Sequence, residues 1–428
     1  MHPLRILLYE ILRLITRIVL WVYYPKTTVI QRKNLKFNRA TIIACSHPNT
    51  MMDPLHVASR TKKPVHFLAN ADLFATKFGN WFYSTMFCIP IRRKIDDRGT
   101  HVDNTNSFDR VTEFLADGGC LWIAPEGGSF WGRHWLSLKT GTARMALLAE
   151  SSKQFQLGLA VLPVGLNYEA PNFFRTKLVI NVGEPIFAKA YQELYEKDYW
   201  NAVKQLTTDL EVALQDLEIA PNDEEEDTLL RRVEIVVQNQ YPAANKESFR
   251  RSKQLLKRIQ AHPNHALETT AEQYFEAIKA QRLTDRAVMH FFERPAFRKV
   301  IDWAWLMLGF PLFLFGFVNN ALPSFLPYYF TNRRQPWIGY RAIVKMLIGL
   351  FAFPFFYTLQ TLLVHSFFQT PWLTFLYLAS LLPTGMFAWH YAKWAWLLFQ
   401  RLRIKKIKPS LQQTLGALRK EILGLVMD

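Results

Sequence analysis

The sequence predicts an α/β fold: a layered domain with a mostly parallel sheet, followed by a helical extension and C-terminal transmembrane helices. Three features support this prediction. Short runs of β-branched residues alternate with helical stretches over residues 25–215, as in domains built from β-α-β units. Residues 216–300 have a charged, helical pattern with few β-branched runs. Residues 301–400 contain apolar stretches as long as a helix needs to cross a bilayer.

The composition limits the classes of protein that fit. The chain has 428 residues, of which 50% are hydrophobic, and a formal net charge of +17. This apolar content excludes disorder as the main state, and three cysteines exclude a disulfide scaffold. A basic chain indicates a negatively charged partner. The 13 Trp and 33 Phe residues favour membrane lipids as that partner, because aromatic rings settle at the headgroup level. With no recognised nucleic-acid motif, we expect no nucleic-acid partner.

The first segment, residues 1–24, is predicted to form an amphipathic helix at a membrane interface. Arginines are interleaved with its apolar residues, whereas a signal peptide would place its charges first. A helix packed on its own domain and a removed signal remain as alternatives. The apolar positions that recur at helical spacing are Leu4, Leu7, Leu8, Ile11, Leu12, Ile15, Ile18 and Val19.

The second segment, residues 25–215, is predicted to be the α/β domain. Helical stretches are expected at 107–117 and 141–150, between β-rich runs. The β-rich runs cover residues 41–45, 65–69, 87–91, 120–124, 159–166 and 178–182.

The third segment, residues 216–300, is predicted to be a helical extension. A run of acidic residues at 221–227 is interpreted as a linker or loop, and helical patterns follow at 252–260 and 270–281. No chemistry can be assigned to this segment.

The fourth segment, residues 301–400, is predicted to be a membrane region. Residues 343–363 and 372–400 are each long and apolar enough for a full span. The stretch 303–330 is also apolar, but Asn and Pro residues interrupt it, so we expect a re-entrant or interfacial hairpin there.

The last segment, residues 401–428, is predicted to be a basic cytoplasmic tail. Five Lys and Arg residues at 401–408 follow the last span and favour binding to anionic lipid headgroups. By the positive-inside rule, the chain is expected to be an integral membrane protein with the domain at 25–215 on the cytoplasmic side.

Three short motifs each follow a predicted strand. His47 and Asp53 could form a general base whose imidazole is oriented by a carboxylate. Glu126, Gly127, Gly128 and Ser129 form a loop whose backbone N–H groups could approach an anion or oxyanion. Arg93 lies in a basic run that could hold a phosphate. No phosphate-binding loop, dinucleotide fingerprint, HExxH or CxxC motif is present, so no bound metal or cofactor is expected.

The order of these motifs resembles that of the glycerophospholipid acyltransferases, the PlsC-like superfamily. The four blocks are His47 with Asp53, Ile-Pro-Ile-x-Arg at 89–93, Pro-Glu-Gly at 125–127 and Leu-Pro-Val at 162–164. Two departures resemble the fungal-type glycerol-3-phosphate/dihydroxyacetone-phosphate acyltransferases. Five residues separate His47 from Asp53 where the family usually has four, and Pro-Glu-Gly-Gly-Ser replaces Pro-Glu-Gly-Thr-Arg-Ser.

The resemblance implies transfer of a fatty acyl group from a thioester, acyl-CoA or acyl carrier protein, to glycerol-3-phosphate or 1-acyl-glycerol-3-phosphate. His47 would take the proton from the acceptor hydroxyl, and Asp53 would orient the His47 imidazole. Arg93 would bind the phosphate, and Glu126 to Ser129 would bind the rest of the acceptor or the oxyanion. The third block lacks its usual Arg, for which Arg93, Arg133 or Lys139 could substitute.

Other functions stay open at this point. The chain could remodel another lysolipid, or it could be a non-catalytic lipid-binding membrane protein. Cys45 lies two residues before His47, so a cysteine nucleophile with an acyl-enzyme intermediate is conceivable, although a buried small residue is the simpler interpretation.

Overall fold

The computed structural model describes residues 3–91, 105–133, 136–293 and 296–427. It divides into two compact units, which are described separately. The first unit comprises Met1–Asn222 together with Trp337–Ile343, and the second comprises Asp223–Pro336 together with Val344–Asp428. The five segments defined from the sequence remain a prediction.

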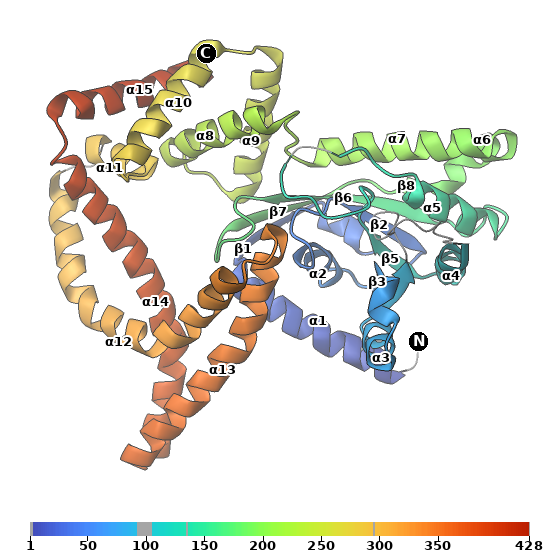
Figure 1. The fold of residues 1–428 in the computed structure, drawn as a ribbon, viewed down its shortest axis with the longest axis horizontal. Coiled ribbons are helices and arrows are strands. Elements are labelled where there is room, and N and C mark those ends of the chain that lie inside the picture. Colours follow the sequence, from blue (N-terminus) through green and yellow to red (C-terminus); the bar gives the residue numbers. More distant parts are fainter. Residues whose placement is uncertain (1–2, 92–104, 134–135, 294–295, 428) are drawn as a thin grey trace. The chain divides into compact units, whose positions relative to one another are not determined.

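The first unit is built on one mixed, mostly parallel sheet in the order β1-β7-β6-β2-β5-β3-β4, with β8 beside β6 (Figure 1). Among the strands that the structure describes, the β6–β7 and β6–β8 pairs are antiparallel and the others are parallel. The predicted α/β fold class is therefore confirmed. The strands are β1 (Lys26–Ile30), β2 (Thr41–Cys45), β3 (His66–Asn70), β4 (Cys88–Ile91), β5 (Cys120–Ile123), β6 (Ala160–Tyr168), β7 (Lys177–Val182) and β8 (Ile186–Phe187).

All six expected β-rich runs coincide with strands, to within two residues at each end. The sequence missed β1 and β8. β1 reads Lys-Thr-Thr-Val-Ile and is only half-buried, so it lacks the apolar run that marked the central strands. β8 has two residues, too few for any pattern.

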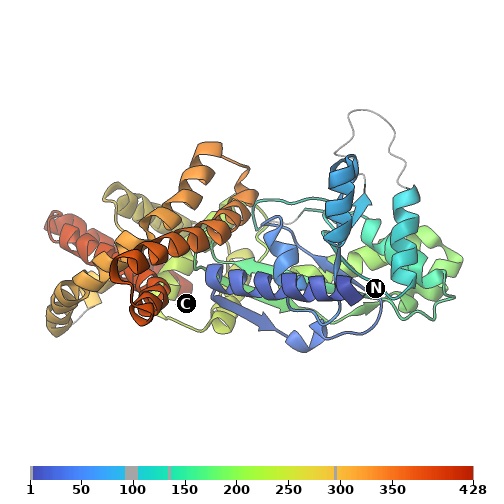
Figure 2. The same cartoon turned by 90° about the horizontal axis from the view of Figure 1, so that it is seen from below.

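Helices cover both faces of this sheet. Because successive strand residues point to opposite faces, Ile42 and Ala44 of β2 pack into one core with α4 (Thr105–Ala116), α5 (Gly141–Ser151) and α7 (Tyr199–Leu217). Helices α1 (Pro3–Tyr23) and α2 (Met52–Ala58) lie on the other face, and Figure 2 shows α1 in front of the strands. The remaining helices of this unit are η1 (Arg32–Leu35), α2 (Met52–Ala58), η2 (Ala71–Phe74), α3 (Lys77–Thr85), η4 (Ala188–Tyr191), α6 (Gln192–Lys197) and η5 (Ile338–Tyr340).

Helix α1 (Pro3–Tyr23) is held to the first unit by its arginines. Arg5 donates to the carbonyl of Ser84, Arg13 to that of Thr61 and Arg17 to that of Ser59, at 2.6–3.0 Å. The opposite side of the helix is an exposed apolar stripe. Its members are Leu4, Leu7, Ile11, Leu14, Ile18 and Trp21. Docking of this stripe on a membrane stays a prediction.

The second unit is helical. The interpretation of the acidic run at 221–227 as a linker or loop holds for its first residues, because the boundary between the units falls at 222–223, but it is wrong for the rest, because helix α8 begins at Glu224. Asp223 caps the helix by accepting from the N–H of Glu226 at 2.8 Å, and acidic residues favour the positive end of a helix. The helices are α8 (Glu224–Gln240), α9 (Asn245–Ala261), α10 (His265–Ala280), α11 (Asp285–Glu293), α12 (Ala296–Arg334), α13 (Arg341–Phe368), α14 (Pro371–Ile404) and α15 (Pro409–Met427).

Three helices are long and apolar enough to cross a membrane, namely Val300–Arg334, Ile338–Phe368 and Pro371–Lys405. The second and third contain the two predicted full spans. In place of the expected hairpin, α12 is a single helix of 39 residues that is visibly bent (Figure 1). Proline kinks a helix without necessarily ending it, and apolar surroundings penalise any break in backbone hydrogen bonding.

One of these proline breaks is repaired by a neighbouring helix. Pro323 has no N–H, so the carbonyl of Asn319, four residues earlier, loses its helical donor. The side chain of Gln360 in α13 donates to that carbonyl at 2.9 Å. Asn320, beside it, accepts from Tyr357 at 2.6 Å and donates to the carbonyl of Leu381 in α14 at 3.2 Å. These bonds explain how α12 continues through the residues that suggested a turn.

The basic run at 401–408 is not wholly free to bind lipid. Helix α14 continues to Ile404, and Arg401 within it is buried and pairs with Asp302 of α12 at 2.7 Å. Residues 409–427 form α15, in which buried Arg419 pairs with Asp285 of α11 at 2.8 Å. The expected tail is therefore largely folded onto its own unit.

Candidate functional site

The candidate site lies where parallel strands end side by side. β2 pairs in parallel with both β5 and β6, so the carboxyl ends of all three meet at one edge of the sheet. Loops that follow such ends form the cleft of an α/β sheet. His47 follows β2, Glu126 follows β5 and Tyr168 ends β6.

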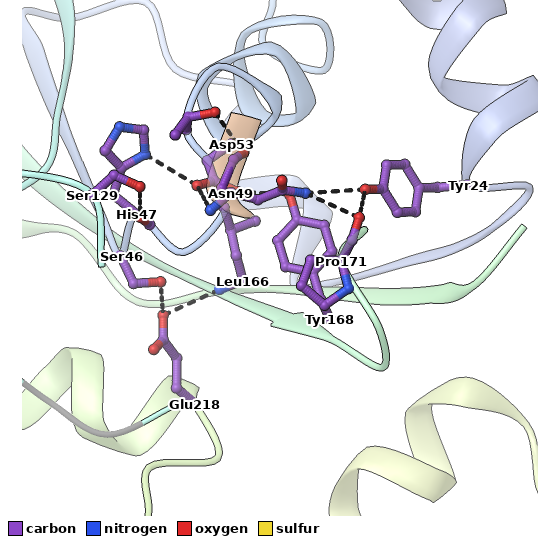
Figure 3. Close-up of polar contacts among 12 residues, drawn as sticks. Tyr24, Ser46, His47, Asn49, Asp53, Ser129, Leu166, Tyr168, Pro171 and Glu218 are labelled. Carbon is purple, nitrogen blue, oxygen red and sulfur yellow. Dashed lines mark hydrogen bonds and ion pairs between the residues drawn. The ribbon is translucent and has the colours of Figure 1, made fainter. Parts of the chain in front are cut away.

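His47 and Asp53 form the expected pair (Figure 3). His47 Nδ1 lies 3.0 Å from Asp53 Oδ2, and the Asp53 carboxylate is fully buried. Asp53 lies in the first turn of α2, where the helix dipole favours a negative charge. With Nδ1 committed to Asp53, Nε2 is the ring nitrogen that can accept a proton. The ring of Trp122 contacts the imidazole edge to face, with centroids 4.9 Å apart.

Two further donors hold the Asp53 carboxylate, and the sequence analysis missed both. The backbone N–H of Asn49 donates to Oδ2 and the Tyr168 hydroxyl donates to Oδ1, each at 2.7 Å (Figure 3). Burial and the nearby Asp53 charge raise the pKa of Tyr168 well above its usual value, so the phenol keeps its proton and remains a donor. Three hydrogen bonds thus fix the carboxylate that orients His47.

The loop after β5 is attached directly to the His47 loop. The Ser129 hydroxyl and the Phe130 N–H both donate to the carbonyl of His47, at 2.6 and 3.2 Å. Gly127 has a φ of +85°, a conformation that glycine adopts without strain. Ser129 was predicted from the sequence to bind substrate. In the structure, its hydroxyl donates to the backbone of His47.

Two carboxyl groups near His47 and Asp53 have pKa values well above the usual range of a glutamate. Burial, and then the charge of Asp53, raise the pKa of Glu126 to about 7. Burial raises the pKa of Glu218 to about 8, and its Oε1 accepts from the Ser46 hydroxyl and from the Leu166 N–H (Figure 3). Glu218 follows α7, far from every motif, and nothing in the sequence marked it.

A cavity of about 1110 Å³ opens beside His47. Its lining includes Gly127, Gly128, Ser129 and Lys139, so the structure brings most of the predicted acceptor-binding loop to the same cavity as His47. Most of the remaining lining is apolar. These apolar residues include Leu12, Leu55, Leu68, Leu73, Phe82, Met86, Phe87, Phe108 and Met145.

The proposed phosphate-binding residue Arg93 lies outside the described residues, so its placement stays a prediction. Lys139, one of the residues expected to substitute for the missing block arginine, does line the cavity. Among the described ranges, no group of three or more His, Cys, Asp or Glu side chains is arranged to hold a metal ion.

The geometry disfavours a cysteine nucleophile. Cys45 is fully buried in β2, and burial together with the charges of Asp53 and Glu218 raises the pKa of its thiol well above the usual value. A thiol that resists ionisation is a poor nucleophile. Cys88, which lines the cavity, has its pKa raised to about 11 by burial.

Comparison with known proteins identifies the class to which this domain is similar. Residues 26–167 match the family model described as Acyltransferase, which confirms the resemblance inferred from the four sequence blocks. Two proteins of Saccharomyces cerevisiae are similar to this chain. Glycerol-3-phosphate O-acyltransferase 2 is 35% identical over 130 residues, and Glycerol-3-phosphate O-acyltransferase 1 is 35% identical over 127 residues.

The similarity is partial. The aligned stretches cover 30% and 29% of this chain and only 17% of each yeast protein, so the chain spans about a sixth of their length. A solved structure, the 1-acyl-sn-glycerophosphate (LPA) acyltransferase PlsC from Thermotoga maritima, is 20% identical with a TM-score of 0.34. It aligns over 48% of this chain and 81% of its own.

Proposed function

We propose that the protein is a membrane-bound O-acyltransferase that transfers a fatty acyl group from a thioester to glycerol-3-phosphate. The observation that carries the proposal is the His47–Asp53 pair at the edge of an apolar cavity. The names of the two yeast relatives favour glycerol-3-phosphate over 1-acyl-glycerol-3-phosphate as acceptor. Acyl-CoA and acyl carrier protein both remain candidate donors.

In this mechanism His47 Nε2 takes the proton from an acceptor hydroxyl, and the oxygen attacks the thioester carbonyl. Asp53 stabilises the imidazolium that forms. Collapse of the tetrahedral intermediate breaks the C–S bond, and His47 returns the proton to the departing thiolate. The backbone N–H of Gly128 is proposed to stabilise the oxyanion, because the Gly127 N–H already donates to the carbonyl of Ala124 at 3.0 Å. Arg93 and Glu126 are proposed to bind the phosphate and a hydroxyl of the acceptor.

The test is an acyl-transfer assay on membranes containing the wild type, His47→Ala and the control His265→Ala, whose residue is exposed at the start of α10. Loss of a general base costs about 10²–10⁴ in rate, so His47→Ala should lose nearly all turnover. We expect the variant to fold, because Asn49 and Tyr168 still hold Asp53.

Each donor is offered with glycerol-3-phosphate, with 1-acyl-glycerol-3-phosphate and with other lysolipids in separate reactions. His47-dependent transfer to glycerol-3-phosphate supports the proposal. Transfer only to another lysolipid would show that this lysolipid, and not glycerol-3-phosphate, is the acceptor. Lipid binding without any transfer would show that the protein is a non-catalytic lipid binder. Full activity of His47→Ala would refute the assigned role of His47.

A further inference from the structure

We propose that residues 337–340, which lie between helices α12 and α13 and fold with the first unit, form part of the wall that binds the acyl chain of the donor. Within this segment, Trp337 and Tyr340 would contact the chain directly. The inference rests on the proposed function, and it adds a specificity element from outside the four sequence blocks. It starts from the position of this segment, because residues 337–343 fold with the catalytic unit although both flanking helices are candidate spans.

A specific hydrogen bond attaches the segment to the catalytic loop. The Thr50 hydroxyl donates to the carbonyl of Gly339 at 2.9 Å, and Thr50 is almost fully buried. Thr50 lies between His47 and Asp53 and has a φ of +41°, which is unfavourable for a β-branched residue. Surrounding structure must stabilise such a conformation, and the bond to Gly339 is one such contact.

This bond also gives a role to the unusual length of the loop. Five residues separate His47 from Asp53, one more than the resembled block normally has. The Asn49 N–H still reaches Asp53, so the loop keeps the orientation of the catalytic pair. The turn at Thr50 accommodates the added length and directs its hydroxyl to the segment between the helices.

The segment places two aromatic rings in the cavity wall. Trp337 and Tyr340 both line the cavity, and each side chain is about half exposed. Their ring centroids are 5.9 Å apart with the planes nearly perpendicular. The Trp337 ring packs so closely over Gly339 that a Cβ there would lie 2.1 Å from it. Gly339 therefore lets the ring fold back over its own backbone.

The chemistry of this wall fits an aliphatic chain. Trp337 and Tyr340 share the cavity with Leu12 of α1, and with Met51 and Leu55 beside the catalytic loop. Glycerol-3-phosphate is small and polar, so the acyl chain is the only apolar part of the proposed substrates. Each methylene removed from water contributes about fourfold in binding, so contacts along such a wall determine chain-length preference.

The experiment compares kcat/KM for saturated acyl-CoA donors from hexanoyl to stearoyl, at a fixed glycerol-3-phosphate concentration. Loss of contact with two or three methylenes lowers kcat/KM by about 15–60-fold. We expect Trp337→Ala to show this loss for long donors only. Thr50→Val should shift the profile in the same direction, whereas Thr50→Ser, which keeps the hydroxyl, should resemble the wild type. Trp372→Ala, at an exposed tryptophan of α14, is the matched control.

A photoreactive acyl-CoA with a diazirine near the chain end supplies a readout that does not depend on turnover. Adducts within residues 337–340 support the proposal. An unchanged chain-length profile in Trp337→Ala, an equal loss at every chain length, or adducts confined to other segments would overturn it. Absence of transfer by the wild type would instead refute the proposed function, so the two failures are distinguishable.

Discussion

The buried Glu218 leads to a quantitative prediction about stability and pH. Its Oε1 accepts from Ser46, the residue before His47, and from the Leu166 N–H at 3.1 Å. Glu218→Gln is a matched perturbation, because the amide oxygen can accept the same two bonds. What the substitution removes is the titration of a carboxyl whose pKa burial raises to about 8.

The sign and size of the change in stability with pH follow from the linkage between folding and proton binding. Between the unfolded pKa of about 4.5 and the folded pKa of about 8, the folded protein binds more protons than the unfolded chain. The resulting stability is fully present below the unfolded value and is lost as pH rises through the folded one. The slope is at most about 1.4 kcal/mol per pH unit, so Glu218 removes about 3 kcal/mol between pH 5 and 7.5. In Glu218→Gln, residue 218 does not titrate, so it makes no contribution to the dependence of stability on pH.

The assay is thermal unfolding of the purified protein in detergent at pH 5, 6 and 7.5. For a unit of this size, about 3 kcal/mol corresponds to roughly 6–12 °C in Tm. The Tm of Glu218→Gln minus that of the wild type should therefore rise by this amount with pH. Glu126 titrates in both proteins and cancels to first order, and Glu193→Gln, at an exposed carboxyl, is the control. A difference that stays constant with pH would refute the reasoning.

Two further predictions concern contacts rather than titration. Tyr168→Phe removes one of three donors to the Asp53 carboxylate, which should cost about 1.5–3 kcal/mol of stability. The variant should also have a lower kcat with the KM for the acyl donor unchanged. An unaltered kcat would contradict a positioning role for Tyr168. Gly385→Ala places a Cβ 2.6 Å from Asn320 Cγ, so it should destabilise the α12–α14 contact by about 1–3 kcal/mol, measured as Tm in detergent. The control Gly424→Ala should leave the Tm unchanged, because a Cβ at this position would meet open space.

The sequence was most informative where local pattern and function coincide. The central strands were found because they are short, buried and β-branched. The pair His47 and Asp53 could then be placed, since loops after parallel strands meet at one edge of the sheet. His47, Asp53 and the loop at Gly127 are therefore close in space, although the intervening chain carries no sign of their contact.

Residues that act through tertiary contacts left no such signal. Tyr168 is 115 positions from Asp53, and Glu218 is 172 positions from Ser46. Nothing local distinguishes either from an ordinary strand or helix-end residue. The interpretation of residues 224–227 as part of a linker or loop was wrong for a related reason, because the same charges suit a solvated linker and the first turn of a helix. Only the cap made by Asp223 separates the two.

The attachment of residues 337–343 to the first unit means that the chain passes between the two units three times, at 222–223, 336–337 and 343–344. A single cut between Asn222 and Asp223 would therefore not separate the units cleanly, because Gly339, which accepts a hydrogen bond from Thr50, would remain with the second fragment. The first unit is completed by a segment that comes much later in the chain, so the fragment 1–222 alone would lack part of it.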